Sequence, residues 1–347
     1  MENTLSERQS KLIRKPPLSK TFIDLDKSSK NDVALSGRSV ADAIAAGVQF
    51  IFSRQQNERW SELVSKAGSP DQWVTAYILG RLGDLPADYF NPAQGKQIER
   101  ALEWLLQART KDDAWGCASG TAADADATAW AMIALRSHGK VVPASAQNWL
   151  QRCRRMDGGF APHTEICQAD CCKTGLPGIT AVAAKALGEL DSRAEGFLET
   201  ELKLATSNDA STLAKGFYVC SEVLDCEAAL APWSLLNSVC HLTALHTPEH
   251  AFELALLLRS LLRMRMRRAW SIAEKLRASQ KADGSWPGSP IWGPVLPGVR
   301  AAEDPPLMDR SGLLATATAV SALWMAESRP RLSYGSDLPR PRRLPEV

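Results

Sequence analysis

The sequence predicts an all-α protein that folds as a single-domain (α/α)6 barrel, a closed ring of alternating inner and outer helices. A short apolar block recurs along the chain at nearly constant spacing, and amphipathic segments lie between its copies. The 347 residues are 45% hydrophobic and 23% charged, which is the balance of a globular protein. We expect the barrel to span residues 38–328, between a flexible N-terminal tail (1–37) and a Pro- and Arg-rich C-terminal tail (329–347).

The recurring block has Thr-Ala at its centre and predicts the inner helices. Its four copies are WVTAY (73–77), DATAW (126–130), GITAV (178–182) and LATAT (314–318). The first three copies are 53 and 52 residues apart, and the final gap of 136 residues leaves room for two further helix pairs. The runs that these blocks open are apolar on nearly every side, as expected of helices that are buried all round.

Amphipathic segments between the blocks predict the outer helices. Examples are SVADAIAAGVQFIFSRQ (39–55), GKQIERALEWLLQ (95–107) and RAWSIAEKLRASQ (268–280), in which apolar residues recur at helical spacing. Several such segments end in Gln, a turn signal and an aromatic residue, as in QKADGSW (280–286). An open solenoid of the same hairpins is the alternative. The unequal repeats favour a closed ring, because solenoids usually have more uniform repeats and polar capping units.

Composition excludes several classes of function. The formal net charge is +2, so no overall charge attracts nucleic acid. The N-terminal region has no apolar segment of the kind found in signal peptides, and the longest apolar stretches are too short to cross a bilayer. We therefore expect a cytoplasmic protein with reduced thiols, and the sequence leaves peripheral contact with a membrane and the oligomeric state open. Eight cysteines are too few and too irregularly spaced for a disulfide scaffold.

Two motifs resemble those of a known enzyme family. QKADGSW (280–286) fits the Gln-x3-Gly-x-Trp repeat of squalene-hopene and oxidosqualene cyclases, and DADATA (124–129) resembles the Asp-x-Asp-Asp-Thr-Ala motif of class II terpene cyclases. The fourth motif position is Ala127 instead of Asp, and the chain has room for one helical domain where most members have two. The resemblance is therefore greatest to single-domain bacterial meroterpenoid cyclases of the merosterolic acid synthase type.

This resemblance implies an isomerase that cyclises a linear polyprenyl small molecule after protonating it, with no cofactor. The central Asp of the family motif, Asp126 in this chain, is the proton donor. Such an acid must keep its proton and be shielded from water. Burial and a second carboxylate nearby both raise the pKa of an Asp. We expect Asp126 and Asp124 to be catalytic, with Asp124 supporting Asp126 through a hydrogen bond; helix capping is the alternative, since Asp is favoured at helix N-termini.

The repeat alignment places aromatic residues around this acid. Trp73 and Asp126 hold the first positions of their blocks, and Tyr77 and Trp130 hold the fifth, one helical turn deeper on the same face. We predict that these rings bind substrate and stabilise carbocations, each by about 0.5–2 kcal/mol. Plain core packing is the alternative. We predict the same substrate-binding role for three further aromatic residues, Phe217, Trp233 and Trp292.

Two other features are candidates for substrate binding. His163 follows an outer helix in DGGFAPH (157–163), and we expect it to hydrogen-bond the acid, as a His does in some relatives. A solvated loop is the alternative position for it. The basic run RSLLRMRMRR (259–268) can anchor a carboxylate, a diphosphate or lipid headgroups, and a solvated helix face is the alternative interpretation.

Metal-dependent functions fit the sequence less well. His163, Cys167, Cys171 and Cys172 match no structural zinc module, and the Asp-rich motif of magnesium-dependent class I synthases is missing, so we expect no metal site. Two rival functions stay open: a zinc-dependent prenyltransferase-like subunit and a non-catalytic isoprenoid-binding barrel. The sequence also leaves open whether the prenyl chain carries an aromatic acid, a diphosphate or no head group, and whether an alkene or an epoxide is protonated.

Overall fold

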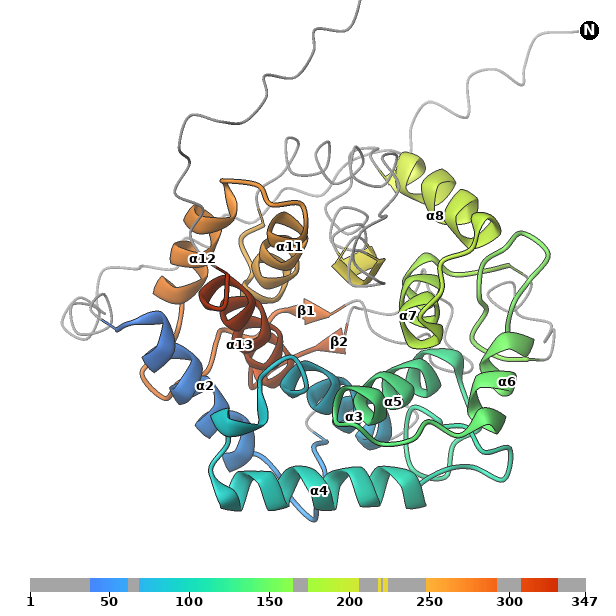
Figure 1. Cartoon of the computed structure of the whole chain (residues 1–347), viewed down its shortest axis with the longest axis horizontal. Coiled ribbons are helices and arrows are strands. Elements are labelled where there is room, and N and C mark those ends of the chain that lie inside the picture. The colour runs from blue at the N-terminus through green and yellow to red at the C-terminus, as the bar shows by residue number, and fades with distance from the viewer. Residues whose placement is uncertain are drawn as a thin grey trace, which may run out of the picture. The chain divides into compact units, whose positions relative to one another are not determined.

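Helices follow one another in outer and inner pairs along the chain (Figure 1). The computed structural model describes residues 38–61, 69–164, 174–205, 218–219, 221–223, 248–291 and 307–329. Its outer helices are α2 (Val40–Ser53), α4 (Pro92–Gln107), α6 (Ala144–Arg152), α8 (Ser192–Ala205) and α12 (Ala269–Ala278). Its inner helices are α3 (Asp71–Leu82), α5 (Ala125–Ser137), α7 (Pro177–Leu187), α11 (Ala251–Arg263) and α13 (Leu313–Glu327).

The chain divides into two compact units, Met1–Gly37 and Arg38–Val347, and every described residue belongs to the second. The predicted N-terminal tail lies outside the described residues, as does the predicted C-terminal tail beyond Arg329. The proposed boundaries of the barrel therefore stay predictions.

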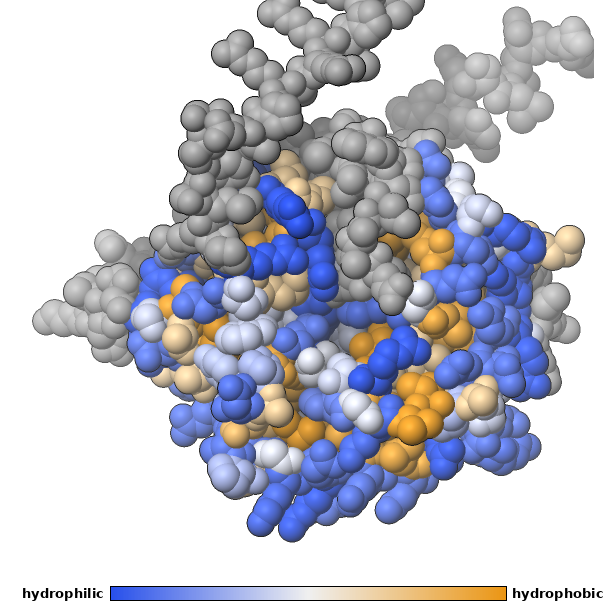
Figure 2. All heavy atoms as spheres, in the orientation of Figure 1, coloured by the Kyte–Doolittle hydropathy of each residue, from blue (hydrophilic) through white to orange (hydrophobic). Residues whose placement is uncertain are grey.

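Inner and outer helices differ in burial, as their sequences predict. Every residue of α3 is buried, whereas the amphipathic α4 buries only Ile98, Ala101, Leu102 and Leu105. The molecular face in Figure 2 is mostly hydrophilic where the residues are described, which fits outer helices that present their polar sides to solvent. None of the described helices is long and apolar enough to cross a membrane.

The inner helices close into a ring. Helix α3 packs on α5, α5 packs on α7, α11 packs on α13, and α13 packs back on α3 (Figure 1). Between α7 and α11, the helical residue Glu222 makes ion pairs with Arg81 of α3 and Lys185 of α7. Contact between the first and last inner helices confirms the predicted closed barrel and excludes the open solenoid. The all-α prediction omitted one small feature, the antiparallel pair of β1 (Pro290–Ile291) and β2 (Leu307–Met308).

The Thr of the repeated Thr-Ala block ties each inner helix to the turn before it. In four units, the Thr hydroxyl accepts a hydrogen bond from the backbone N–H of the aromatic residue in that turn. The pairs are Trp60 with Thr75 (3.0 Å), Trp115 with Thr128 (3.1 Å), Phe160 with Thr180 (2.8 Å) and Trp286 with Thr316 (2.9 Å). The block therefore recurs because each repeat has a buried backbone N–H to satisfy.

Three buried indoles complete this repeated joint. Trp60, Trp115 and Trp286 each donate the indole N–H to a backbone carbonyl near the end of the preceding outer helix, at 2.7 to 2.8 Å. The last carbonyls of a helix have no partner within the helix, so each indole satisfies one of them while filling the core. These three tryptophans are part of the scaffold, and each joins an outer helix to the inner helix that follows it.

Candidate active site

Asp126 lies in the first turn of α5, beside the start of α3. Its carboxyl oxygen Oδ2 accepts a hydrogen bond from the indole Nε1 of Trp73 at 2.8 Å, and the residue is only 6% exposed. The other oxygen, Oδ1, is buried and has no hydrogen-bond partner in the described part of the chain. One oxygen is therefore held in place, and the other is buried without a hydrogen-bond partner among the described residues. The alignment of the repeats predicts this proximity of Trp73 and Asp126, and the structure confirms it.

Asp124 is the N-cap of α5. Its backbone is extended, with φ −131° and ψ 155°, and its carboxylate accepts a hydrogen bond from the backbone N–H of Ala127 at 2.8 Å. The backbone N–H groups of Asp126 and Cys117 also donate to this carboxylate. No hydrogen bond joins the two carboxyl groups, although both residues are described, so the hydrogen bond between Asp124 and Asp126 runs to the Asp126 backbone. Asp124 caps the helix that carries Asp126, because its oxygens are engaged by backbone N–H groups.

Burial keeps a proton on this pair near neutral pH. Loss of solvation raises the pKa of Asp126 to about 8; the negative charges of Asp124 and Glu222 raise it too, and the Trp73 hydrogen bond opposes the rise. Burial also raises the pKa of Asp124 to about 7, against the lowering effect of its three backbone donors. Asp126 is therefore the carboxyl group that holds its proton more tightly.

The aromatic residues of the two adjacent inner helices contact one another. The Trp73 and Tyr77 rings are stacked with centroids 5.5 Å apart, and the Tyr77 and Trp130 centroids are 4.5 Å apart. The Tyr77 hydroxyl is 2.6 Å from that of Thr318, so the fifth positions of three Thr-Ala blocks meet inside the ring. Trp130 Nε1 donates to the Tyr218 hydroxyl at 3.0 Å. The predicted cluster of rings therefore exists, one turn from Asp126.

A buried ionic cluster that the sequence analysis missed lies against these rings. The Arg81 guanidinium is 4.8 Å from the centroids of both Tyr77 and Trp130, and it makes an ion pair with Glu222. Glu222 also binds Lys185 at 2.9 Å. Arg81 follows Trp73 and Tyr77 at steps of four residues, so its place on the same buried face of α3 was a signal in the sequence. The barrel interior is therefore charged as well as aromatic.

The remaining predicted residues are placed differently or lie outside the described residues. The ring of His163 donates from Nδ1 to the carbonyl oxygen of Ala123 at 3.0 Å, and not to either carboxyl group. His163 therefore holds the loop that leads into Asp124. Three predicted substrate-binding residues lie outside the described residues, namely Phe217, Trp233 and Trp292.

The basic run 259–268 divides into a buried and an exposed part. Arg259 is fully buried, binds Asp84 at 2.7 Å and donates to Ser321, so the solvated helix face was wrong for this residue. Arg263 and Arg265 are exposed, as that interpretation predicts. In the described residues, no group of three His, Cys, Asp or Glu side chains could hold a metal ion.

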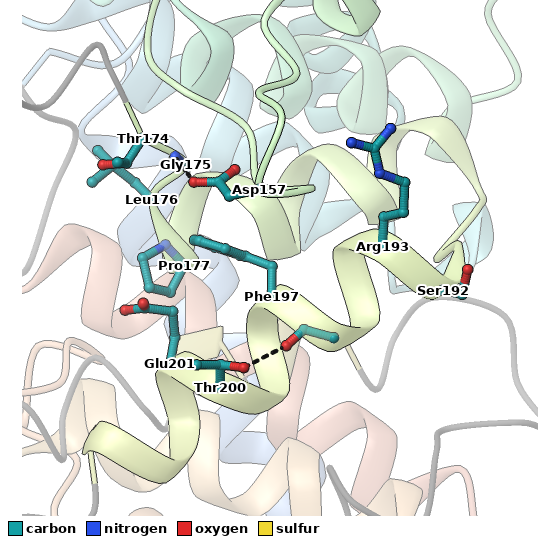
Figure 3. A pocket seen from close by; sticks show the side chains of 11 residues that line it. Asp157, Thr174, Gly175, Leu176, Pro177, Ser192, Arg193, Phe197, Thr200 and Glu201 are labelled. Carbon is teal, nitrogen blue, oxygen red and sulfur yellow. Dashed lines mark hydrogen bonds between the residues drawn. The ribbon is translucent and has the colours of Figure 1, made fainter.

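A separate pocket of about 700 Å³ lies between the start of α7 and α8 (Figure 3). Asp157, Pro177, Phe197 and Glu201 are among its lining residues, and the ring of Phe197 reaches toward Pro177. The carboxylate of Asp157 already accepts hydrogen bonds from two backbone N–H groups of the surrounding loops, so it stabilises the pocket wall. None of the lining residues belongs to the Asp126 cluster. The cluster is the stronger candidate for chemistry, because it contains a buried carboxyl oxygen without a partner among the described residues.

Comparison with known proteins supports the fold. No protein-family model and no curated protein matches the chain. A crystal structure of a protein from Actinoplanes matches with a TM-score of 0.66 and 20% identity, covering 84% of this chain and 100% of the other. A variant of the type II terpene cyclase MstE from Scytonema matches with a TM-score of 0.63 and 20% identity, covering 85% of this chain and 98% of the other.

A larger enzyme shares part of the architecture. The ent-copalyl diphosphate synthase from Streptomyces platensis matches with a TM-score of 0.52 and 17% identity, covering 74% of this chain and 50% of the other. At such identities the likeness concerns the fold. The chain thus has the helical barrel fold found in these terpene cyclases, as the resemblance of its motifs implied.

Proposed function

We propose that this protein is a single-domain class II terpene cyclase, an isomerase that protonates a linear polyprenyl substrate with Asp126. The observation that carries this proposal is the buried Asp126 carboxyl group. Trp73 holds it through Oδ2, and Oδ1 has no hydrogen-bond partner among the described residues. A scaffold has no need for such a group, since a buried polar atom without a partner destabilises the fold. A proton donor for an apolar substrate needs this arrangement, because the reacting alkene offers no hydrogen bond in the ground state.

In the proposed reaction, the proton leaves Asp126 and forms a C–H bond at the terminal alkene of the prenyl chain. In an epoxide substrate it forms an O–H bond instead, and a carbon–oxygen bond of the ring then opens. The resulting carbocation is attacked by the next double bond, and ring closure continues along the chain. Asp126 is then a carboxylate, and the Trp73 N–H donor stabilises that new charge. Loss of a proton from the last cation gives a product that is an isomer of the substrate, so no redox cofactor takes part.

The surrounding residues suit this chemistry in two ways. Trp73, Tyr77 and Trp130 are buried, and rings near a cation stabilise it through their negative faces. Burial also excludes the water that would trap a carbocation. Two structures of MstE variants contain geranylgeranyl dihydroxybenzoate as the substrate and merosterolic acid A as the product. A geranylgeranylated aromatic acid is therefore the first substrate to test.

The decisive experiment is incubation of the purified protein with a geranylgeranylated dihydroxybenzoic acid, geranylgeranyl diphosphate and squalene. Mass spectrometry should find a product with the mass of its substrate and a new retention time. The Asp126→Asn variant, with a normal thermal melt, is the matched control and should give none. Unchanged substrate that is nevertheless bound would favour the non-catalytic isoprenoid-binding barrel. Activity that EDTA abolishes and zinc restores would favour the prenyltransferase-like subunit.

A further inference from the structure

Arg81 is a fully buried cation with unused hydrogen-bond donors. Its Nη2 donates to Glu222, whereas its Nε and Nη1 atoms have no hydrogen-bond partner in the described part of the chain. Buried polar groups in proteins are almost always paired, and an unpaired N–H on a charged group is especially unfavourable. These two nitrogen atoms therefore indicate a partner that binds from outside the chain.

The position of Arg81 is inside the ring of inner helices. The residue starts from α3, its guanidinium contacts the rings of Tyr77 on α3 and Trp130 on α5, and its ion-pair partner Glu222 lies on the segment between α7 and α11. A side chain that spans these three elements crosses the interior of the barrel. A ligand of Arg81 would therefore occupy the space in which the proposed substrate binds.

The chemistry of the cluster favours an anion. Glu222 binds two cations, because its Oε1 accepts a hydrogen bond from Arg81 and its Oε2 accepts one from Lys185. Lys185 also lies 5.5 Å from the centroid of the Trp130 ring. The guanidinium lies over the Tyr77 and Trp130 rings, and its positive charge repels a carbocation in the same interior. An oxyanion bound to Arg81 would neutralise part of this charge.

We propose that Arg81 binds an oxyanion on the head group of the substrate, either a carboxylate or a phosphate. This inference rests on the proposed cyclase function and narrows it, because it excludes a hydrocarbon substrate without a head group. Guanidinium groups bind both kinds of oxyanion through charge-assisted hydrogen bonds. The substrate would then contact both groups, with its alkene beside Asp126 Oδ1 and its anion bound to Arg81.

The spacing along α3 defines how such a substrate must fold. Trp73 is level with Asp126, and Arg81 follows Trp73 by two helical turns, with a side chain that contacts Tyr77 one turn nearer. The acid and the guanidinium are thus separated by one to two turns, or about 5–11 Å along the helix axis. A polyprenyl chain that joins the two points has to coil between them, which brings its double bonds together for ring closure.

Binding measurements test this inference separately from catalysis. In the Asp126→Asn background, which cannot turn the substrate over, titration calorimetry compares geranylgeranylated dihydroxybenzoic acid with its methyl ester, and geranylgeranyl diphosphate with geranylgeraniol. We expect each acid to bind about 10–100-fold more tightly than its neutral analogue if its oxyanion is the one recognised. The pair with the larger ratio identifies the head group as carboxylate or phosphate.

The variant Arg81→Gln with Glu222→Gln should abolish this preference by weakening the acid and leaving the neutral analogue unchanged. Glu222 is replaced together with Arg81 so that the buried cluster of Arg81, Glu222 and Lys185 keeps its net charge when the guanidinium is lost. Arg259→Gln is the matched control, because Arg259 is equally buried and ion-paired but its partners are Asp84 and Ser321; it should keep the preference. Equal binding of acid and neutral analogue, or a preference that survives the double variant, overturns the inference.

A crystal structure of the Asp126→Asn variant with the better-binding acid decides the question if the double variant does not fold. The head-group oxyanion should lie within hydrogen-bond distance of Arg81 Nε or Nη1, and a head group elsewhere overturns the inference. The two proposals fail separately. If wild-type protein cyclises acid and ester equally well, the cyclase function stands and the oxyanion site at Arg81 is wrong. If binding shows an Arg81-dependent preference but no substrate is cyclised, the oxyanion site stands and the cyclase function is wrong.

Discussion

The starts of α5 and α13 share two features, although their N-cap residues differ, Asp124 in α5 and Gly312 in α13. Each has a buried carboxylate that accepts a backbone N–H at 2.8 Å, from Ala127 to Asp124 in α5 and from Ala315 to Asp309 in α13. Burial raises the pKa of both carboxyl groups, to about 7 for Asp124 and about 6 for Asp309. Both helices also use a Thr to accept the backbone N–H of a preceding Trp. The scaffold therefore has a buried acid that accepts a backbone N–H at each of these two helix starts.

The difference that bears on chemistry lies at the first position of the Thr-Ala block. This position is Leu314 in α13 and Asp126 in α5. Asp126 makes no bond to the backbone N–H groups of its own helix start, and one of its oxygens has no partner among the described residues. Comparison of the two helices thus separates a structural acid from one that the scaffold does not require. The predictions below test that separation, from the largest expected effect to the smallest.

Replacing Asp126 should abolish cyclisation and leave the fold intact. Asn has the shape of Asp but cannot protonate an alkene, so Asp126→Asn should lower the rate by more than about 10⁴-fold. The melting temperature should stay near that of the wild type, because a neutral amide replaces a neutral acid. Mass spectrometry of products and a thermal melt measure the two effects.

The opposite result is expected at α13. Asp309→Ala should remove the acceptor of the Ala315 backbone N–H in the first turn of α13 and destabilise the protein by about 0.5–2 kcal/mol, while the folded protein keeps its rate within severalfold. If Asp126→Asn turns over at nearly the wild-type rate, the proton comes from another group and the assignment of Asp126 fails.

The cyclisation rate should depend on pH through the ionisation of Asp126. Its proton is lost at a pKa of about 8, so the cyclisation rate should be constant near neutrality and fall above about pH 8. The pKa is raised on folding, so the folded state holds the proton over the range from about pH 4 to about pH 8. The contribution of Asp126 to the folding stability is therefore fully present below about pH 4 and is lost as the pH rises through about 8.

Urea unfolding at several pH values should reveal this contribution. The difference in unfolding free energy between the wild type and Asp126→Asn should move against the wild type as the pH rises from about 4 to about 8. A difference that is independent of pH would mean that Asp126 titrates in the folded protein as it does when unfolded.

Removing the Trp73 donor should weaken the acid without removing it. The Trp73 hydrogen bond lowers the pKa of Asp126, so Trp73→Phe should raise that pKa and lower the rate at pH 7 by about tenfold, a difference of about 1.4 kcal/mol. The pH above which the cyclisation rate falls should therefore be higher in this variant than in the wild type. Trp115→Phe also removes an indole N–H donor and is the matched control; it should lower the melting temperature and leave the position of this fall unchanged.

The smallest effect on the cyclisation rate should come from replacing the Thr residues that bind the Trp backbone N–H groups. Thr128→Val in α5 and Thr316→Val in α13 each leave a Trp backbone N–H without its acceptor, which destabilises a protein by about 1–3 kcal/mol. Both should lower the melting temperature by a few degrees, to a similar extent. A selective loss of activity in Thr128→Val at normal stability would show that the two helix starts are not equivalent.

The sequence was sufficient for the fold, for the register of the inner helices and for the contact of Asp126 with Trp73. These features depend on local periodicity and on repeats, which place equivalent positions of neighbouring helices at the same level of the barrel. The same register brought Tyr77, Trp130 and Thr318 together across the closed ring. Sequence patterns are reliable here because a closed repetitive fold has few ways to bury its apolar helices.

Only the tertiary structure decided how the polar groups of the interior are paired. Arg81 and Glu222 are 141 residues apart, and no repeat or spacing in the sequence predicts their contact. The role of Asp124 as a cap and the contact of His163 with Ala123 likewise depend on backbone angles and loop paths. Periodicity determines which face of a helix is buried, but the partner of a buried polar atom depends on ångström-scale distances between elements far apart in sequence, and these distances exist only after the ring has closed.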